Sequence, residues 1–141
     1  MTINETQDEI IAEFEGLTDW MDRYAYIIEL GNTLPPFPEK EKIPQNLIEG
    51  CQSRVWIAAR KEGDKIHFDA DSDALIVKGI VALLLRVLND RTPDEILNAD
   101  LYFIEKIGLK EHLSPTRSNG LVAMVRQIHN YAKAFKLVEG K

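Results

Sequence analysis

The N-terminal part of the chain alternates apolar and polar residues with the period of an α-helix. A first apolar stripe follows Thr6-Gln7-Asp8-Glu9, which has the spacing of a capping box, and it predicts a helix over about residues 6–15. A second stripe runs from Asp19, a candidate N-cap, to Gly31, where a helix would end. We therefore expect two consecutive helices, with their aromatic residues packed in a core.

The middle of the chain changes from helical to strand-like patterning. Residues 34–42 are rich in proline and charge and cannot continue a helix, so we interpret them as a solvated connector. Residues 55–59 are β-branched, aromatic or apolar, and residues 65–68 alternate polar with apolar side chains. The segment between these two runs has the composition of a turn. This pattern predicts a β-hairpin that turns at Gly63.

The residues after the hairpin predict the centre of the fold. Residues 69–73 are polar and leave room for one more short strand. Asp71, Ser72 and Asp73 suit helix N-capping, and the helix that they would introduce, about residues 74–88, is apolar on nearly all sides. Such a helix is normally the buried central one. Metal ligation by the two aspartates is an alternative, but two carboxylates without a nearby histidine make a weak site.

The C-terminal third predicts further helices. Thr92-Pro93-Asp94-Glu95 is a capping box with proline at the first helical position. A second helix would start after Asp100 and end at Gly108, and Ser114-Pro115 starts the last long helix. Helices that flank a small antiparallel sheet of two to three strands make the fold class α+β. The length predicts a single domain over residues 1–141.

Charge and hydropathy narrow the function classes. The formal net charge is −6 and the basic residues are scattered, which argues against nucleic acid, because its backbone rewards a clustered basic face. The acidic N-terminus lacks the basic start and apolar run of a signal peptide. The longest apolar run is interrupted by Lys78 and Arg86 and is too short to cross a membrane. We therefore expect a cytoplasmic protein in a reducing compartment.

The chain contains one cysteine, Cys51, in the segment Gly50-Cys51-Gln52-Ser53 at the mouth of the first predicted strand. A single thiol excludes an intrachain disulfide, a multi-cysteine zinc site and a self-contained iron–sulfur cluster, so we expect no metal at this site. Free cysteines are usually buried and inert. Turn-forming and polar neighbours on both sides are uncommon at core positions, however, and favour an accessible thiol on a tight turn.

Three ordered blocks of the sequence carry a resemblance to a known family. They are residues 50–56 (GCQSRVW), 71–79 (DSDALIVKG) and 112–121 (HLSPTRSNGL). On these blocks the sequence resembles the SufE family of sulfur-acceptor proteins, over about residues 24–131. Arg54 stands where many members have glutamine and Thr116 where many have serine, and neither change touches the thiol.

This resemblance implies a SufE/IscU-like fold and a function for Cys51. The thiol would accept sulfur as a covalent persulfide from a SufS-type cysteine desulfurase, stimulate that enzyme, and pass the sulfur to the SUF scaffold complex that assembles iron–sulfur clusters. The protein would bind no cofactor, since the pyridoxal phosphate belongs to the desulfurase. It would be a transfer partner rather than a stand-alone enzyme. The related CsdE branch, which serves a CsdA-type desulfurase, and the choice between monomer and homodimer stay open.

An ordinary cysteine is only a few per cent thiolate at neutral pH, so a cation or backbone amides near Cys51 would help it to react. Gly50, Gln52 and Arg54 are candidates for a supporting loop. Arg117, in a predicted loop over residues 114–120, is another, if the fold brings that loop to the thiol. A surface salt bridge is the alternative interpretation for Arg117.

Two other functions have to be compared with the sulfur carrier. A cysteine peptidase needs a histidine within hydrogen-bond reach and an oxyanion hole, and nothing around His112 or His67 indicates them. The second function is that of a non-covalent adaptor, which activates a cysteine desulfurase by docking while Cys51 carries no sulfur. The Cys51→Ser protein separates the adaptor from the carrier.

Overall fold

The computed structural model describes residues 1–48 and 53–139; residues 49–52 and 140–141, and the side chains of residues 115–117 and 139, are outside this description. The elements follow one another along the chain as α1 (Ile3–Glu15), α2 (Trp20–Gly31), the 3-10 turns η1 (Glu39–Glu41) and η2 (Pro44–Asn46), β1 (Val55–Glu62), β2 (Lys65–Ser72), α3 (Leu75–Leu88), α4 (Pro93–Asn98), α5 (Phe103–Lys106), α6 (Leu109–His112) and α7 (Pro115–Glu139).

The predicted hairpin is confirmed. Strands β1 and β2 pair antiparallel from Val55 opposite Ser72 to Glu62 opposite Lys65, and Gly63 turns the chain with φ of +63°. The strand alternation of β2 continues past the predicted end, so residues 69–72 extend β2 instead of forming a separate strand. Within the described part of the chain the sheet therefore has two strands.

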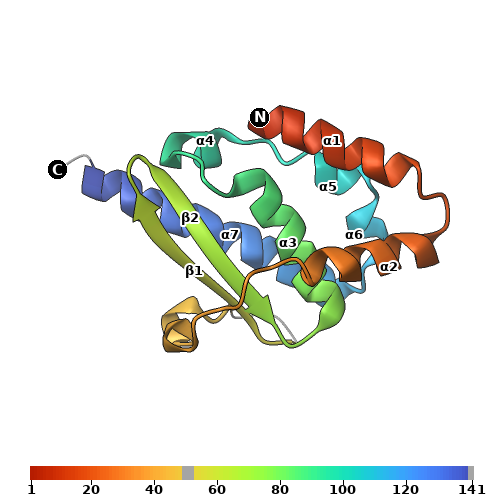
Figure 1. Ribbon diagram of the computed structural model, residues 1–141, viewed down its shortest axis with the longest axis horizontal. Helices are drawn as coiled ribbons and strands as arrows, with labels where there is room; N and C mark the ends of the chain where they lie inside the picture. Colours follow the sequence, from red (N-terminus) through yellow and green to blue (C-terminus); the bar gives the residue numbers. More distant parts are fainter. Residues whose placement is uncertain (49–52, 140–141) are drawn as a thin grey trace.

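Helix α3 is the central element, as its composition predicts. It packs against α2 and α1 on one side and against β2 on the other, and α7 also contacts it and runs along β1. Figure 1 shows this arrangement, with the hairpin on one side of α3 and α1 and α2 on the other. The helix buries ten of its residues: Val77, Gly79, Ile80, Val81, Ala82, Leu83, Leu84, Leu85, Val87 and Leu88.

The crossing of α2 and α3 depends on glycine. A Cβ atom added to Gly79 would lie 2.0 Å from the backbone oxygen of Ile27, and one added to Gly31 would lie 2.9 Å from the backbone nitrogen of Gly79. Neither distance is compatible with a real methyl group, and the obstacle is backbone that cannot rotate away. The two helices therefore approach closely because both positions lack a side chain.

The N-terminal capping box lies one turn before the predicted one. The side chains of Thr2 and Glu5 make the reciprocal bonds of a capping box, and α1 begins at Ile3. The pair predicted from Thr6-Gln7-Asp8-Glu9 is wrong, since Thr6 is buried inside the helix and donates its hydroxyl to the Thr2 carbonyl oxygen. Thr2 and Glu5 have the same spacing, so pattern alone did not distinguish the two.

The remaining helix boundaries agree with the pattern, with one addition. The capping box of Thr92 and Glu95 is confirmed at the start of α4. The helix predicted between Asp100 and Gly108 is the single turn α5, and Gly108, at φ of +73°, precedes a second single turn, α6, that was not predicted. None of the described helices combines the length and the apolar character needed to cross a membrane.

Candidate functional site

The chain on either side of residues 49–52 is fixed by backbone pairing. The amide of Ile48 donates a hydrogen bond to the carbonyl oxygen of Val55 at 2.9 Å, and Leu47 forms a bridge with Trp56. The segment that enters residues 49–52 therefore lies antiparallel to the first residues of β1. These bonds bring the two described ends of the segment side by side at the open end of the hairpin.

The residues that leave this segment are bound by the loop between β2 and α3. The amide of Arg54 donates to Asp73 Oδ1 at 3.0 Å, and the carbonyl oxygen of Arg54 accepts from Ser72 Oγ at 2.8 Å and from the Asp73 amide at 3.3 Å. We call Arg54, Ser72 and Asp73 the exit contacts. Both polar groups of the Arg54 backbone are thus satisfied, which fixes the path of the chain at the start of β1.

These bonds correct the predicted capping of α3. The N-cap of α3 is Ala74, which makes no side-chain cap bond. Ser72 and Asp73 direct their side chains to Arg54, and Ser72 Oγ also accepts from the Ala74 amide at 3.2 Å. Serine and aspartate side chains can bond to several nearby backbone groups, of which a helix N-terminus is one. Here the backbone of Arg54, at the start of the opposite strand, is the group that they bond to.

The residues that precede residues 49–52 are bound by α7. The hydroxyl of Tyr131 donates to Asn46 Oδ1 and lies 3.1 Å from the carbonyl oxygen of Ile57, while Asn46 Nδ2 donates to the Glu41 carbonyl oxygen at 2.8 Å. Gln127 Nε2 donates to the carbonyl oxygen of Gln45 at 3.1 Å. We call Gln45, Asn46, Gln127 and Tyr131 the entry contacts.

Burial distinguishes the bond between Tyr131 and Asn46 from a surface hydrogen bond. The side chain of Asn46 is almost fully enclosed, since the residue is only 6% exposed. Burial also raises the pKa of Tyr131, so its hydroxyl keeps its proton and can donate at neutral pH. A buried amide that lost this donor would be left with an unsatisfied oxygen, which costs about 1–3 kcal/mol.

The two aspartates weighed as metal ligands do not form a site together. Asp71 lies between two lysines, 3.6 Å from Lys42 Nζ and 3.5 Å from Lys78 Nζ. Asp73 instead accepts from the Arg54 amide. The carboxylate of Asp71 is therefore balanced by two ammonium groups, and the metal alternative has no support in the described geometry.

The predicted site residues are described only in part. Gly50, Cys51 and Gln52 lie outside the described residues. Arg54 is exposed, and its guanidinium forms no ion pair with a described side chain. Arg117 belongs to the first turn of α7 rather than to a loop, and its side chain is outside the description. The support that Arg54 and Arg117 give to the thiol therefore stays a prediction.

His112, the histidine weighed for a peptidase, is occupied by structural contacts. Its ring stacks on Trp20 with the centroids 3.7 Å apart, and its Nδ1 lies 3.0 Å from the carbonyl oxygen of Gly108. A carbonyl oxygen only accepts, so Nδ1 carries the proton. His67 lies on the turn half of β2, far along the hairpin from its open end. The described geometry gives no support to a peptidase.

Sequence reasoning missed the entry contacts. The sequence singles out neither Tyr131 nor Asn46 as a site residue. The two residues are 85 positions apart, so no local pattern links them. The connector that ends before them is also not fully solvated, since Phe37 is 9% exposed and belongs to the buried core.

Comparison with known proteins decides the family. Residues 8–132 match the family SufE, which is described as an Fe-S metabolism associated domain. This match spans most of the chain. The chain belongs to the SufE family. A protein of Rhizobium etli, named an uncharacterized SufE-like protein, is 45% identical to it over an aligned length of 131 residues, and the alignment covers 89% of this chain and 88% of that protein.

The fold is shared with a solved structure. The solution structure of a hypothetical protein from Thermus thermophilus superimposes with a TM-score of 0.75 and covers 92% of this chain and 94% of its own, at 23% sequence identity. The resemblance to the SufE family and the α+β fold class are therefore both confirmed. Membership of this family associates the protein with iron–sulfur metabolism.

Proposed function

We propose that this SufE-family protein is a sulfur carrier that receives sulfane sulfur on Cys51 from a cysteine desulfurase and passes it to an iron–sulfur cluster scaffold. The observation that carries the proposal is the double anchoring of the segment that contains Cys51. Entry contacts from α7 hold the chain before it, and exit contacts from the β2–α3 loop hold the chain after it. A carrier needs such a base, because its thiol has to meet two different partners in a defined position.

The chemistry needs only one thiol. The Cys51 thiolate attacks the terminal sulfur of a persulfide on the desulfurase cysteine, a new S–S bond forms to Cys51, and the desulfurase cysteine leaves as a thiolate. The transferred sulfur keeps its proton and its oxidation state, so no external oxidant or reductant takes part. A later thiolate repeats the step and removes the sulfur from Cys51.

The partner follows from this chemistry and from the family. The donor would be a SufS-type cysteine desulfurase, whose pyridoxal phosphate generates the persulfide, and the acceptor would be the SUF scaffold complex. The carrier itself would hold sulfur only as the covalent persulfide on Cys51. Removal of that persulfide from the desulfurase frees its cysteine for the next turnover, so the carrier would also stimulate the enzyme.

Arg54 has the properties of a residue that assists the thiol or its partner. Its backbone is fixed by Ser72 and Asp73, while its exposed guanidinium forms no ion pair with the described side chains. If the guanidinium reaches the Cys51 thiol, its positive charge would favour the thiolate over the thiol. Arg117, at the start of α7, is the second candidate for this role.

The test measures alanine release from cysteine by a SufS-type desulfurase with and without the protein. The carrier predicts that the wild type raises turnover, and that Cys51→Ser binds the desulfurase with unchanged affinity but gives no stimulation. If Cys51→Ser stimulates the desulfurase as much as the wild type does, the sulfur-carrier proposal is wrong and the non-covalent adaptor takes its place. Asp94→Ala is a control, because Asp94 is an exposed aspartate on α4 whose ion pair among the described residues is with Lys136, on α7.

A further inference from the structure

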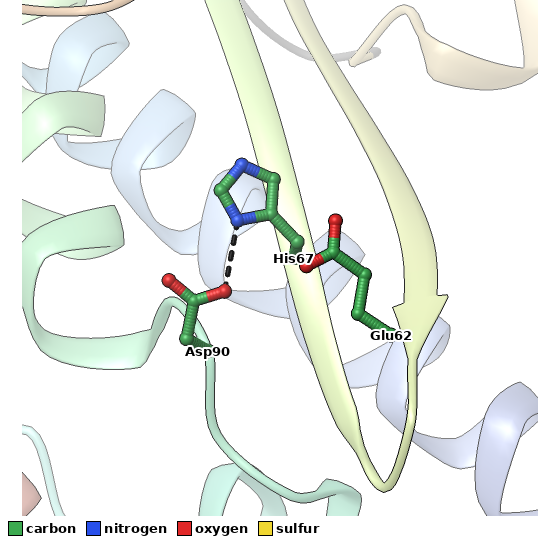
Figure 2. A group of neighbouring side chains, drawn as sticks. All are labelled: Glu62, His67 and Asp90. Atoms are coloured by element: carbon green, nitrogen blue, oxygen red, sulfur yellow. Dashed lines mark hydrogen bonds and ion pairs between the residues drawn. The ribbon is translucent and has the colours of Figure 1, made fainter.

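The turn end of the hairpin carries a cluster of ligating groups that the sulfur-carrier function does not use. Glu62 at the end of β1, His67 on β2 and Asp90 in the turn after α3 each offer one ligand atom, and these atoms all lie within 4.8 Å of one another. Figure 2 shows the imidazole of His67 facing Asp90, with the Glu62 side chain on the neighbouring strand. We propose that Glu62, His67 and Asp90 bind a divalent first-row transition metal ion of the Zn²⁺ class.

The contacts of His67 give its ring the orientation of a metal ligand. Nδ1 lies 2.9 Å from Asp90 Oδ1, and Nε2 lies 3.6 Å from Asp69 Oδ1. When an ion replaces the proton on Nδ1, the proton of the neutral ring sits on Nε2, on the side of the ring where Asp69 lies. A carboxylate behind a ligating histidine fixes the tautomer and strengthens the ligand in known zinc sites. One imidazole and two carboxylates form a donor set that zinc accepts.

The distances need a small adjustment at one residue. Ligand atoms about 2.1 Å from a single zinc ion lie roughly 3.0 to 3.5 Å from one another. The pair formed by His67 and Asp90 is already close to this separation. Glu62 is exposed, so a change of rotamer that releases Arg60 brings its carboxylate the remaining distance, about 1 Å.

The turn that carries Asp90 is held in register with His67. Asp90 adopts φ of +59°, and its amide donates to the carbonyl oxygen of Ile66 at 2.9 Å. The Ile66 amide in turn donates to the carbonyl oxygen of Arg91 at 2.9 Å. A pocket of about 330 Å³ opens beside His67, Asp69 and Asp90 and gives water room to complete the coordination.

The local charge favours a divalent cation. Three carboxylates, those of Glu62, Asp69 and Asp90, meet two cationic residues on this face of the hairpin. Arg60 bonds to both Glu62 and Asp69 at 2.7 Å, and Lys65 stands opposite Glu62 in the ladder. With neutral histidine the charges sum to −1. Arg60 therefore competes with the ion for Glu62, and its removal should strengthen binding rather than weaken it.

The site is separate from the thiol. Glu62 and Lys65 close the turn end of the ladder, while Val55 and Ser72 stand at its open end. An ion bound at the turn end would link β1, β2 and the turn after α3 and would stabilise the folded chain by mass action. The proposal thus stands whether or not Cys51 carries sulfur.

The test is a calorimetric titration of the untagged Cys51→Ser protein with zinc chloride, so that no thiolate contributes to binding. We expect one zinc ion per chain, and at least a tenfold loss of affinity in His67→Gln and in Asp90→Asn made in this background. Asparagine tolerates the positive φ of position 90, so the second variant keeps the backbone. Asp94→Asn, which removes an exposed carboxylate elsewhere, should bind zinc unchanged.

Arg60→Gln should raise the affinity for zinc, an effect that damage to the fold would not produce. It should bind zinc several-fold more tightly than its Cys51→Ser parent, because Glu62 and Asp69 lose their competing partner. Zinc should also raise the melting temperature of the parent and leave that of His67→Gln unchanged. Failure of the parent to bind zinc saturably, or equal affinity in the parent and His67→Gln, would overturn the proposal.

Discussion

The two ends of the β1–β2 hairpin are held by different kinds of interaction. At the open end, beside residues 49–52, side chains bond to backbone groups. Asn46 donates to the Glu41 carbonyl oxygen and is held by the Tyr131 hydroxyl. Asp73 accepts from the Arg54 amide. At the turn end, charged side chains bond to one another, as Arg60 does to Glu62 and Asp69. The backbone of β2 is also bonded to the segment after α3, through Ile66 and Phe68, so the contrast lies in what the exposed side chains at each end do.

This difference separates two physical roles. A hydrogen bond to backbone, partly buried, fixes where the chain runs and is costly to leave unmade. An exposed ion pair is screened by water and salt and contributes little to stability, so its groups are available to other ions. We therefore expect substitutions in the entry and exit contacts to affect stability and sulfur transfer, and substitutions of the exposed charged side chains at the turn end to affect neither.

The largest effect should come from a methyl group added at the crossing of α2 and α3. Gly79→Ala would place Cβ 2.0 Å from the Ile27 backbone oxygen and force α2 and α3 apart, which should cost about 3 kcal/mol of unfolding free energy. A Cβ atom added at Gly63, at the turn end, meets nothing within 4 Å. Gly63→Ala should therefore lower the unfolding free energy only by the cost of a positive φ for alanine, about 1 kcal/mol. Urea unfolding of both variants makes the comparison, and equal losses would show that the crossing is not tightly packed.

The next effect should appear at the entry contacts. Tyr131→Phe removes the donor to Asn46 Oδ1 and should lower the unfolding free energy by about 1 to 2 kcal/mol and slow sulfur uptake from the desulfurase. Tyr102→Phe is the matched control, because the Tyr102 hydroxyl bonds to Asn4 and Asp8 on the exposed surface, where water can replace it. The account would be contradicted by a Tyr131→Phe protein as stable as Tyr102→Phe.

The same tyrosine predicts a dependence on alkaline pH. Burial raises the folded-state pKa of Tyr131, so below the unfolded pKa, about 10, its stabilising contribution is fully present. As the pH rises above that value and through the folded pKa, the contribution is lost, because the unfolded chain releases the proton first. The difference in stability between the wild type and Tyr131→Phe should therefore shrink above pH 10, and a constant difference would contradict the assignment.

A smaller effect is expected at the exit contacts. Asp73→Ala removes the acceptor of the Arg54 amide and should cost about 1 kcal/mol, since water reaches the freed group. Its main consequence should be a several-fold slower transfer of sulfur, with Asp94→Ala as the control at wild-type rate. Transfer at the wild-type rate in Asp73→Ala would show that the path of the chain after Cys51 does not matter to the reaction.

The smallest effect is expected at the turn end. Arg60→Gln removes two exposed ion pairs and, in the absence of metal ions, should leave the melting temperature and the rate of sulfur transfer unchanged. A marked loss of either would erase the contrast between the two ends. Differential scanning calorimetry and the desulfurase assay provide the two readouts.

Most of the fold could be predicted because its signals are local. The signals for the hairpin turn at Gly63 and for the capping box at Thr92 each lie within four consecutive residues. The composition of residues 75–88 alone predicts a buried central helix. The errors arise where two residues offer the same local signal. Thr2 and Thr6 have equal capping patterns, and only the packing of α1 selects the first.

The candidate site was harder to predict because its bonds are long-range. Cys51 and its neighbours were found from local composition and from the family resemblance. Tyr131 and Asn46, by contrast, are 85 residues apart, and no local sequence pattern predicts the hydrogen bond between them. Ser72 and Asp73 are misleading in the sequence, because their residue types predict helix capping while their side chains bond to the backbone of Arg54.

The central claim is that Cys51 carries sulfur, and intact-mass measurement tests it most directly. The protein and its Cys51→Ser variant are incubated with a SufS-type desulfurase and cysteine, and their masses are compared under non-reducing conditions. The carrier predicts that the wild type alone gains the mass of one or more sulfur atoms, and that a reductant removes the gain. No gain on the wild type, with binding to the desulfurase intact, would contradict the account and leave the protein as a non-covalent adaptor.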